Sequence, residues 1–298
     1  MFNIGGFKEK FKSPINLSLS TLTKQKFVFQ DGTKYAVLNQ IGEGGFAFVY
    51  RVKKATVLKA GNEEHFAVKK MICQLPEQIE EGEKEIMILR KLQNEHVMPL
   101  LGTSISLNGK GQTEILLLLP LYAGTVQTFI DNNHKGPPYC PFEDARDILT
   151  TMRGTITGLQ ALHEAGYRHG DLKPANILLT TFNSSTMKAV LTDFGSCAPL
   201  IQPVTCRQAA LNIQDHAASY STASIRAPEL FDTPSSGVII SGQADVWSLG
   251  CTFYSCLFSH TPFEDPLQGL STLAVLSGTY KVPTGHPQQY PKENPKLP

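Results

Sequence analysis

The spacing of hydrophobic and polar residues changes about a third of the way along the chain. From Tyr35 to about residue 119, short apolar runs alternate with polar positions and glycines, which is typical of β-strands. We expect two strands in "YAVLNQIGEGGFAFVYRVKKATVL" and one each in "EHFAVKKMI", "VMPLLGTSIS" and "TEILLLLPLY". Between them, "EQIEEGEKEIMILRKLQ" has apolar residues at helical spacing. The first part is therefore predicted to be a five-stranded sheet with one helix.

The remaining two thirds is dominated by helical spacing. The stretch "FEDARDILTTMRGTITGLQALHEAGY" predicts a long helix that ends at Gly166, with an apolar face formed by Ile148, Met152, Ile156, Leu159 and Leu162. The stretch "QADVWSLGCTFYSCLFS" is apolar almost all round and predicts a buried helix, and "PLQGLSTLAVLSG" predicts one more. Short strands are expected at "ILL" and "AVLTDF". The whole pattern indicates an α+β protein.

Composition narrows the class of protein. The 298 residues suffice for two lobes, and 27 basic residues nearly balance 26 acidic ones, which argues against a dedicated nucleic-acid binder. The longest apolar run, "ILLLLPLY", is too short for a transmembrane segment. Six cysteines without CxxC spacing indicate reduced, buried thiols in a cytoplasmic protein. Residues 1–34, with six lysines, are predicted to be flexible, and peripheral attraction to anionic intracellular membranes stays open.

Two features of the first part suit phosphate binding. Glycines 42, 44 and 45 in "GEGGFAFV" would let backbone amides approach phosphate oxygens, although a hairpin turn without a ligand has the same pattern. Lys69 in "FAVKK" could reach the phosphates from its strand, and Glu85 on the predicted helix could pair with it. Taken by themselves, Lys69 and Glu85 are better explained as a surface lysine and a surface glutamate.

The stretch "YRHGDLKPANILL" gathers three polar groups that suit phosphoryl transfer. Asp171 can accept the proton of an attacking hydroxyl, Lys173 can neutralise the transferred group, and Asn176 offers an oxygen to a hard cation. "TDFG" supplies a second carboxylate, Asp193. "RAPEL" at 226–230 follows a predicted loop of more than thirty residues.

Taken in this order, the motifs resemble those of eukaryotic protein kinases over about residues 35–280. Within that group, "GEGGFAFVY", "LLLLPLYAGT" and "RQAALNIQDHAASYSTASIRAPELF" resemble the Numb-associated kinase family, nearest its myristoylated and palmitoylated serine/threonine kinase branch. The resemblance implies a two-lobed kinase fold, with an N-lobe at 35–119 and a C-lobe at 123–298. It implies ATP and Mg²⁺ as cofactors and a protein with Ser or Thr acceptors as substrate.

The resemblance also implies a role for each motif residue. Asp171 would be the catalytic base, Lys173 would contact the γ-phosphate, and Lys69, tethered by Glu85, would hold the α- and β-phosphates. Asn176 and Asp193 would bind Mg²⁺, and Asp245 would brace the catalytic loop. Lys173 and Thr222 resemble the pattern of serine/threonine kinases. The nucleotide would lie among Ile41, Gly42, Gly44, Gly45, Val49, Ala67, Pro120, Tyr122 and Leu178.

Three positions depart from the kinase pattern. Gly170 replaces the arginine that binds a phosphorylated activation loop, so activity is expected not to depend on that phosphorylation. Phe2 follows Met1, so N-myristoylation is not expected. The C-lobe is expected to lack its terminal helices, which would leave Glu229 without its arginine partner and indicates either a fragment or a degenerate kinase.

We therefore expect an ATP-dependent serine/threonine protein kinase. The alternative is a pseudokinase or scaffold with weak or no turnover, which the shortened C-lobe and Gly170 would suit. A small-molecule phosphotransferase is a third interpretation, and "RAPEL" with the long segment before it argues against this one.

Overall fold

The computed structural model describes residues 25–55, 64–133, 142, 145–183, 186–265 and 267–283. The chain divides into two compact units. The first consists of Met1–Ile72 and Gly102–Leu118, and the second of Cys73–Leu101 and Leu119–Pro298. In the described part of the chain, no helix is long and apolar enough to span a membrane.

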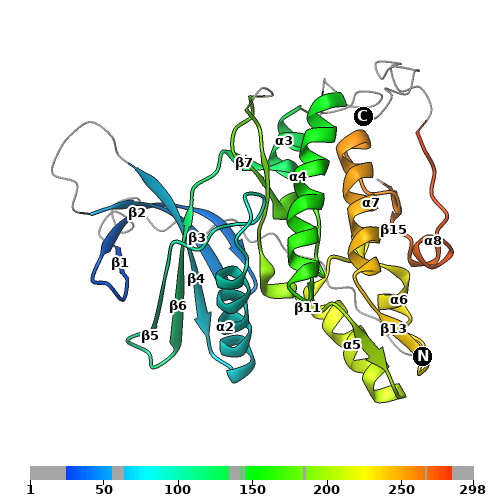
Figure 1. Ribbon diagram of the computed structural model, residues 1–298, viewed down its shortest axis with the longest axis horizontal. Helices are drawn as coiled ribbons and strands as arrows, with labels where there is room; N and C mark the ends of the chain where they lie inside the picture. Colours follow the sequence, from blue (N-terminus) through cyan, green and yellow to red (C-terminus); the bar gives the residue numbers. More distant parts are fainter. Residues whose placement is uncertain are drawn as a thin grey trace. The chain divides into compact units, whose positions relative to one another are not determined.

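The first unit is built on a six-stranded sheet in the order β1-β2-β3-β4-β6-β5 (Figure 1). Its strands are β1 (Lys26–Val28), β2 (Lys34–Gly44), β3 (Ala47–Lys54), β4 (His65–Cys73), β5 (Gly102–Leu107) and β6 (Thr113–Pro120). The strands β2 to β6 confirm the five predicted from alternation, although the predicted "VMPLLGTSIS" strand begins only at Gly102. The sixth strand, β1, was not predicted.

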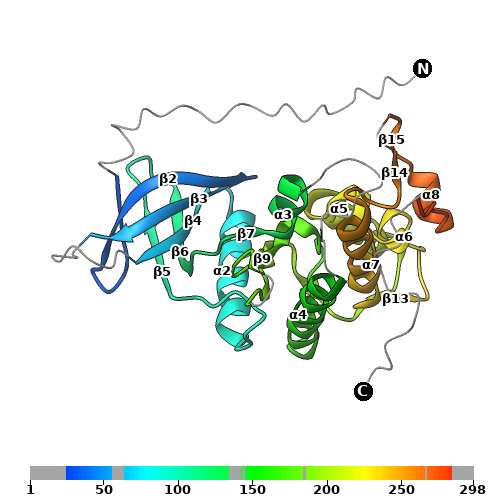
Figure 2. The same cartoon turned by 90° about the horizontal axis from the view of Figure 1, so that it is seen from above.

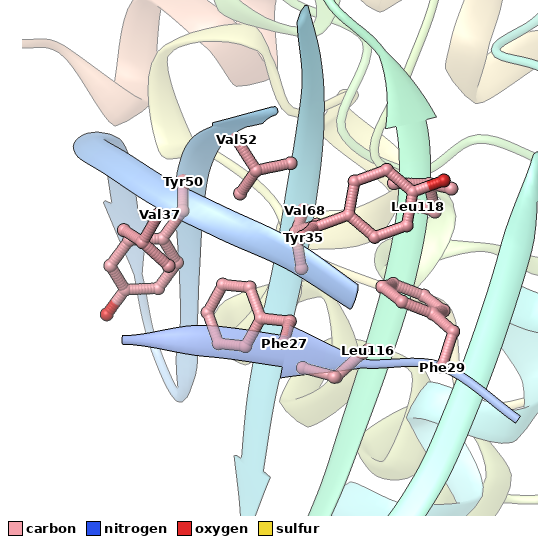
Figure 3. Close-up of a cluster of buried hydrophobic side chains, with 9 residues drawn as sticks. All are labelled: Phe27, Phe29, Tyr35, Val37, Tyr50, Val52, Val68, Leu116 and Leu118. Carbon is pink, nitrogen blue, oxygen red and sulfur yellow. The ribbon is translucent and has the colours of Figure 1, made fainter. Parts of the chain in front are cut away.

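One face of this sheet carries an aromatic and aliphatic core (Figure 3). Alternate positions of neighbouring strands place nine buried side chains together, namely Phe27, Phe29, Tyr35, Val37, Tyr50, Val52, Val68, Leu116 and Leu118. The Phe27 ring lies 5.4 Å from the Tyr50 ring, between their centroids. Residues 26–34 are therefore structured, which corrects the expectation of a flexible segment through residue 34. Residues 1–24 lie outside the described part.

The second unit is helical (Figure 2). Its described helices are α2 (Pro76–Lys91), α3 (Val126–Asn133), α4 (Ala145–Glu164), α5 (Arg207–Tyr220), α6 (Pro228–Phe231), α7 (Gln243–Phe258) and α8 (Thr272–Ser277). The helices α2, α4, α7 and α8 confirm predicted ones, and Gly166 follows α4 with a φ of +92°, which glycine adopts readily. The predicted inner face of α4 is correct except for Ile156, which is 48% exposed.

Short strands connect these helices. A three-stranded sheet joins β7 (Gly124–Thr125), β9 (Ile177–Leu179) and β10 (Ala189–Leu191). Three two-stranded pairs complete the described strands: β8 (Tyr167–Arg168) with β11 (Ala198–Pro199), β12 (Gln202–Val204) with β13 (Val238–Ile240), and β14 (Glu264–Asp265) with β15 (Gly269–Leu270). The 3₁₀ helices are η1 (Pro174–Asn176), η2 (Phe194–Ser196) and η3 (Ala223–Ile225).

Two sequence-based expectations are wrong in this unit. The loop expected before "RAPEL" contains the 14-residue helix α5, whose buried face is formed by Ala210, Ile213 and Ala217. The cysteines were expected to be buried, yet Cys206 at the start of α5 is exposed. Cysteines 73, 197, 251 and 256 are buried as expected, whereas Cys140 lies outside the described residues.

Candidate active site

Asp171 lies in the loop between β8 and η1 and is 5% exposed. Its Oδ1 accepts a hydrogen bond from the Thr222 backbone N–H at 2.7 Å, and its Oδ2 lies 2.8 Å from Lys173 Nζ. The Asn176 side-chain amide donates to the Asp171 carbonyl oxygen at 2.8 Å and to Oδ2 at 3.3 Å. These contacts fix the direction of a buried carboxylate that still has acceptor capacity for a substrate proton.

Lys173 connects the loop that holds Asp171 to the segment after α5. Besides its ion pair with Asp171, its ammonium group donates to Thr222 Oγ1 at 2.7 Å. Asp171 and Thr222 are 51 positions apart in the chain, and the structure brings both of them to Lys173. The two residues singled out as typical of serine/threonine kinases, Lys173 and Thr222, therefore lie in direct contact.

The predicted cation ligands also lie on adjacent loops. The Thr192 backbone N–H donates to the Asn176 carbonyl oxygen at 3.1 Å, so Asp193 directly follows a residue bonded to Asn176. Because the Asn176 amide nitrogen is committed to Asp171, its side-chain carbonyl is the end that a cation could use. One carboxylate and one amide oxygen fit Mg²⁺, which prefers few protein oxygens and keeps waters and phosphates as its other ligands.

Asp245 at the start of α7 holds the backbone of the loop that contains Asp171, as the resemblance implied. Its carboxylate accepts hydrogen bonds from the backbone N–H groups of His169 at 2.7 Å and Gly170 at 2.9 Å, and from His163 Nε2 at 2.7 Å. Burial raises the pKa of Asp245, but the contacts with His163, His169 and Gly170 outweigh it, and the pKa lies below its usual value. The contact between His163 and Asp245 also joins α4 to α7, which lie side by side in both views (Figures 1 and 2).

The backbone itself explains Gly170. Its φ is +82°, a conformation that costs other residues energy, and an added Cβ would lie 2.7 Å from the Ser196 carbonyl oxygen. Both constraints favour glycine at this position. The conformation of this loop therefore requires glycine at position 170 for steric reasons. This reason is separate from the absence of the arginine that the kinase pattern has there.

Sequence reasoning missed the part played by His169. Its Nδ1 lies 3.3 Å from the Asp171 backbone N–H, and its Nε2 lies 3.1 Å from the Thr192 carbonyl oxygen. These partners assign the neutral tautomer with the proton on Nε2. The ring also contacts the fully buried Phe194, with centroids 5.6 Å apart. His169 thereby joins the Asp171 loop to the Asp193 loop.

Arg168 is a second residue that the sequence did not single out. It is 3% exposed, and its Nη2 donates to Gln202 Oε1 at 3.0 Å. Burial lowers the pKa of Arg168, and the carboxylates of Asp245 and Glu229 act in the opposite direction. Glu229 was expected to be a buried carboxylate without a partner. In the structure it is partly exposed, and Arg168 provides a nearby positive charge.

The glycine-rich stretch forms the β2–β3 hairpin of the first unit. Gly42 pairs with Val49, and the turn follows Gly44, with Gly45 at a φ of +32°. Val49 also pairs with Lys69 on β4, which places these side chains on one face of the sheet. Ala67, two positions before Lys69, lies on that same face and is 6% exposed, whereas Ile41 is 46% exposed.

The remaining predicted residues belong to the second unit. Pro120 ends β6, Tyr122 follows it, and Leu178 lies on β9; each is partly buried. Glu85 on α2 is 3% exposed, and its Oε2 would lie 3.9 Å from a Cβ placed on Gly195. Lys69 belongs to the first unit and Glu85 to the second. The pairing of these two residues therefore stays a prediction.

Comparison with known proteins agrees with these features. The family described as the protein kinase domain matches residues 35–294. The chain is 34% identical to serine/threonine-protein kinase 16 of Mus musculus over 250 residues, which cover 83% of this chain and 77% of that protein. It is 30% identical to serine/threonine-protein kinase ppk13 of Schizosaccharomyces pombe over 309 residues, covering 90% and 85% respectively.

Proposed function

Because the chain belongs to the protein kinase family, we propose that it transfers the γ-phosphate of ATP to serine or threonine hydroxyls of proteins. The single observation that supports this most strongly is the arrangement of Asp171, Lys173 and Thr222. A buried carboxylate, an ammonium group and a hydroxyl meet within hydrogen-bond distances of 2.7 to 2.8 Å. The three groups are those needed to orient an acceptor alcohol and to receive its proton.

In the proposed reaction, the acceptor oxygen attacks the γ-phosphorus while its proton passes to the Asp171 carboxylate. The new O–P bond forms as the bond from the γ-phosphorus to the bridging oxygen breaks, and ADP leaves. Lys173 offsets negative charge on the transferred group from its position 2.8 Å from Asp171 Oδ2. Most of the rate enhancement in such reactions comes from positioning and charge neutralisation, which suits the rigid anchoring of Asp171.

We propose Asp193 and Asn176 as the protein ligands of Mg²⁺. The support is the donor set described above, a carboxylate and an oriented amide on adjacent loops. When bound, the ion would neutralise phosphate charge and orient the nucleotide. Asn176→Ala should therefore raise the Mg²⁺ concentration needed for half-maximal turnover. An unchanged Mg²⁺ dependence would contradict this assignment.

For the nucleotide itself, we propose the Gly42–Gly45 hairpin, Val49, Ala67 and Lys69 of the first unit as phosphate and adenine contacts. Ile41, Pro120, Tyr122 and Leu178 complete the proposed set, and Glu85 is proposed to hold Lys69. The support is the resemblance together with the shared face of Val49, Ala67 and Lys69. Lys69→Met should abolish turnover, and full activity of this variant would contradict the proposal.

The acceptor preference can be tested directly. Peptides identical except for Ser, Thr or Tyr at one position, together with glycerol as a small alcohol, would be offered with labelled ATP and Mg²⁺. We expect label on the Ser and Thr peptides alone. Preferential labelling of glycerol would indicate a small-molecule phosphotransferase, and labelling of the Tyr peptide alone would contradict the acceptor class.

We also propose the finer placement in the Numb-associated kinase family and a cytoplasmic location. The placement is supported by the three stretches named above, including residues 207–231, in which α5 is found. An alignment with that branch that required an insertion or deletion inside α5 would contradict the placement. Recovery of the expressed protein inside a secretory compartment would contradict the location.

A further inference from the structure

Tyr220, on the last turn of α5, makes a contact that the proposed function does not use. Its hydroxyl donates a hydrogen bond to Glu81 Oε1 on α2, 139 positions earlier in the chain. Both side chains are partly buried, and both belong to the second unit. A phenol that donates to a carboxylate makes one of the stronger hydrogen bonds in proteins.

The α2 end of this contact leads to the DFG segment. Glu81 is one helical turn before Glu85, whose Oε2 lies close to Gly195. The neighbouring Lys84 donates from Nζ to the Cys197 carbonyl oxygen at 2.9 Å. The face of α2 that holds Tyr220 is therefore attached to residues 195–197 as well.

The other end leads to the catalytic loop. Two positions after Tyr220, Thr222 donates its N–H to Asp171 and accepts from Lys173. Between them, the Ser221 carbonyl accepts from Arg226 Nη2 at 2.6 Å. Residues 220–222 thus connect α2 to the proposed catalytic base, Asp171. This connection does not require a phosphorylated residue.

We propose that Tyr220 is a positioning residue, whose bond to Glu81 fixes the end of α5 so that Thr222 stays against Asp171 and Lys173. This inference rests on the proposed kinase activity, and it adds a residue that holds the proposed catalytic groups in position. Gly170 cannot pair with a phosphorylated segment, and the Tyr220–Glu81 bond provides a fixed attachment for the same stretch of chain. The segment before "RAPEL" would then be held in place by hydrogen bonds built into the fold.

The surroundings of Tyr220 favour the donor role at neutral pH. The bond to Glu81 raises the pKa of Tyr220 to about 12, so the phenol keeps its proton. Its ring also lies against the His216 ring, with centroids 4.8 Å apart. Phenylalanine at position 220 would keep this ring contact and remove only the hydroxyl, which separates the hydrogen bond from simple packing.

The first experiment compares Tyr220→Phe with a matched control, Tyr254→Phe. Tyr254 on α7 donates its hydroxyl to the Lys281 carbonyl at 2.7 Å, so the control also loses one internal hydrogen bond of the same unit. We expect kcat to fall about tenfold for Tyr220→Phe, the loss typical of a hydrogen bond to a charged group. The KM for ATP should change less than twofold, and Tyr254→Phe should keep wild-type kcat.

Glu81 variants supply the second readout. Glu81→Gln retains an acceptor oxygen and should keep more activity than Glu81→Ala. Adding Tyr220→Phe to Glu81→Ala should cause no further loss, because each change removes the same bond. Independent, additive losses would overturn the proposal, and so would wild-type kcat in Tyr220→Phe.

Amide hydrogen exchange tests the inference without relying on turnover. The Thr222 N–H, bonded to Asp171, should exchange faster in Tyr220→Phe than in wild type or in Tyr254→Phe. If the wild-type protein transfers no phosphate, the proposed function fails and exchange alone decides the role of Tyr220. Unchanged exchange at Thr222 in Tyr220→Phe would overturn that role in either case.

Discussion

At the scale of single residues, Gly170 shows how one backbone position determines what a loop can contain. Its left-handed φ and the nearby Ser196 carbonyl leave no room for a side chain without rearrangement. The glycine therefore has an explanation that does not involve a loss of activity. Gly170 by itself therefore does not favour a pseudokinase.

We predict that Gly170→Ala lowers the free energy of unfolding by about 2–4 kcal/mol, from backbone strain and the 2.7 Å approach to Ser196. Gly250→Ala on α7 is the matched control, since an added Cβ meets nothing within 4 Å there. The control should be neutral or stabilising by about 0.5–1 kcal/mol, because alanine favours helix. Urea unfolding of both variants checks this, and equal stabilities would contradict it.

His216 gives a prediction about pH. Burial, followed by the charges of Lys84 and Arg168, lowers its pKa from 6.5 to about 4. The unfolded chain therefore binds more protons than the folded protein between these values, and stability falls as the pH drops from 6.5 towards 4. For this partly exposed side chain we expect a loss of about 2 kcal/mol.

The variant His216→Phe keeps a ring against Tyr220 and removes the titrating group. Unfolding free energies measured by urea at pH 7 and pH 4.5 should therefore differ less for His216→Phe than for the wild type. If both proteins lose the same stability over this range, the lowered pKa of His216 is contradicted.

At the scale of elements, the strand β1 shows where pattern reading fails. It has three residues, of which Phe27 is buried and Val28 is 48% exposed, and Phe29 directly after the strand is buried again. Alternation over so few residues, next to a lysine-rich stretch, is indistinguishable from chance. What makes it a strand is the tertiary contact with β2 and Tyr50, which lies outside any local window.

Phe27→Ala should destabilise the first unit by about 3–5 kcal/mol, because it empties a buried aromatic position. Val28→Ala, on the neighbouring exposed position, should change stability by less than about 0.5 kcal/mol. Thermal or urea unfolding of the two variants makes the comparison. A Phe27→Ala variant as stable as Val28→Ala would indicate that β1 is not part of the folded core.

The helix α5 illustrates a different failure. Ala210, Ile213 and Ala217 have helical spacing, and the stretch contains no proline or glycine. The helix could therefore have been predicted from its own residues. The position between "DFG" and "RAPEL" indicates a loop, and the helical spacing of these residues contradicts that indication. By contrast, α2, α4 and α7 have long periodic stretches and were predicted correctly.

At the scale of the whole molecule, the order of motifs along the chain predicts the family. The structure adds the contacts between residues that are far apart in the sequence. Asp171, Lys173 and Asn176 could be singled out because they lie within six residues of each other. The attachment of Thr222 to Asp171, of Asp245 to the catalytic loop and of Tyr220 to Glu81 joins residues 51 to 139 positions apart. Residues so far apart leave no recognisable pattern in the local sequence. Of these contacts, the resemblance implied only that of Asp245.

The central claim is that the anchored Asp171 carboxylate serves a protein kinase. Its most direct test is phosphate transfer from labelled ATP with Mg²⁺ to a general protein substrate, with wild type beside Asp171→Asn. Both proteins should be folded, and both should show ATP-dependent thermal stabilisation.

We predict that the wild type labels serine and threonine and that Asp171→Asn is slower by about 10²–10⁴-fold, the range typical of general acid–base groups. A folded wild type that is stabilised by ATP yet transfers no phosphate would contradict the claim and identify a nucleotide-binding pseudokinase. Equal rates for the two proteins would show that Asp171 is not the base.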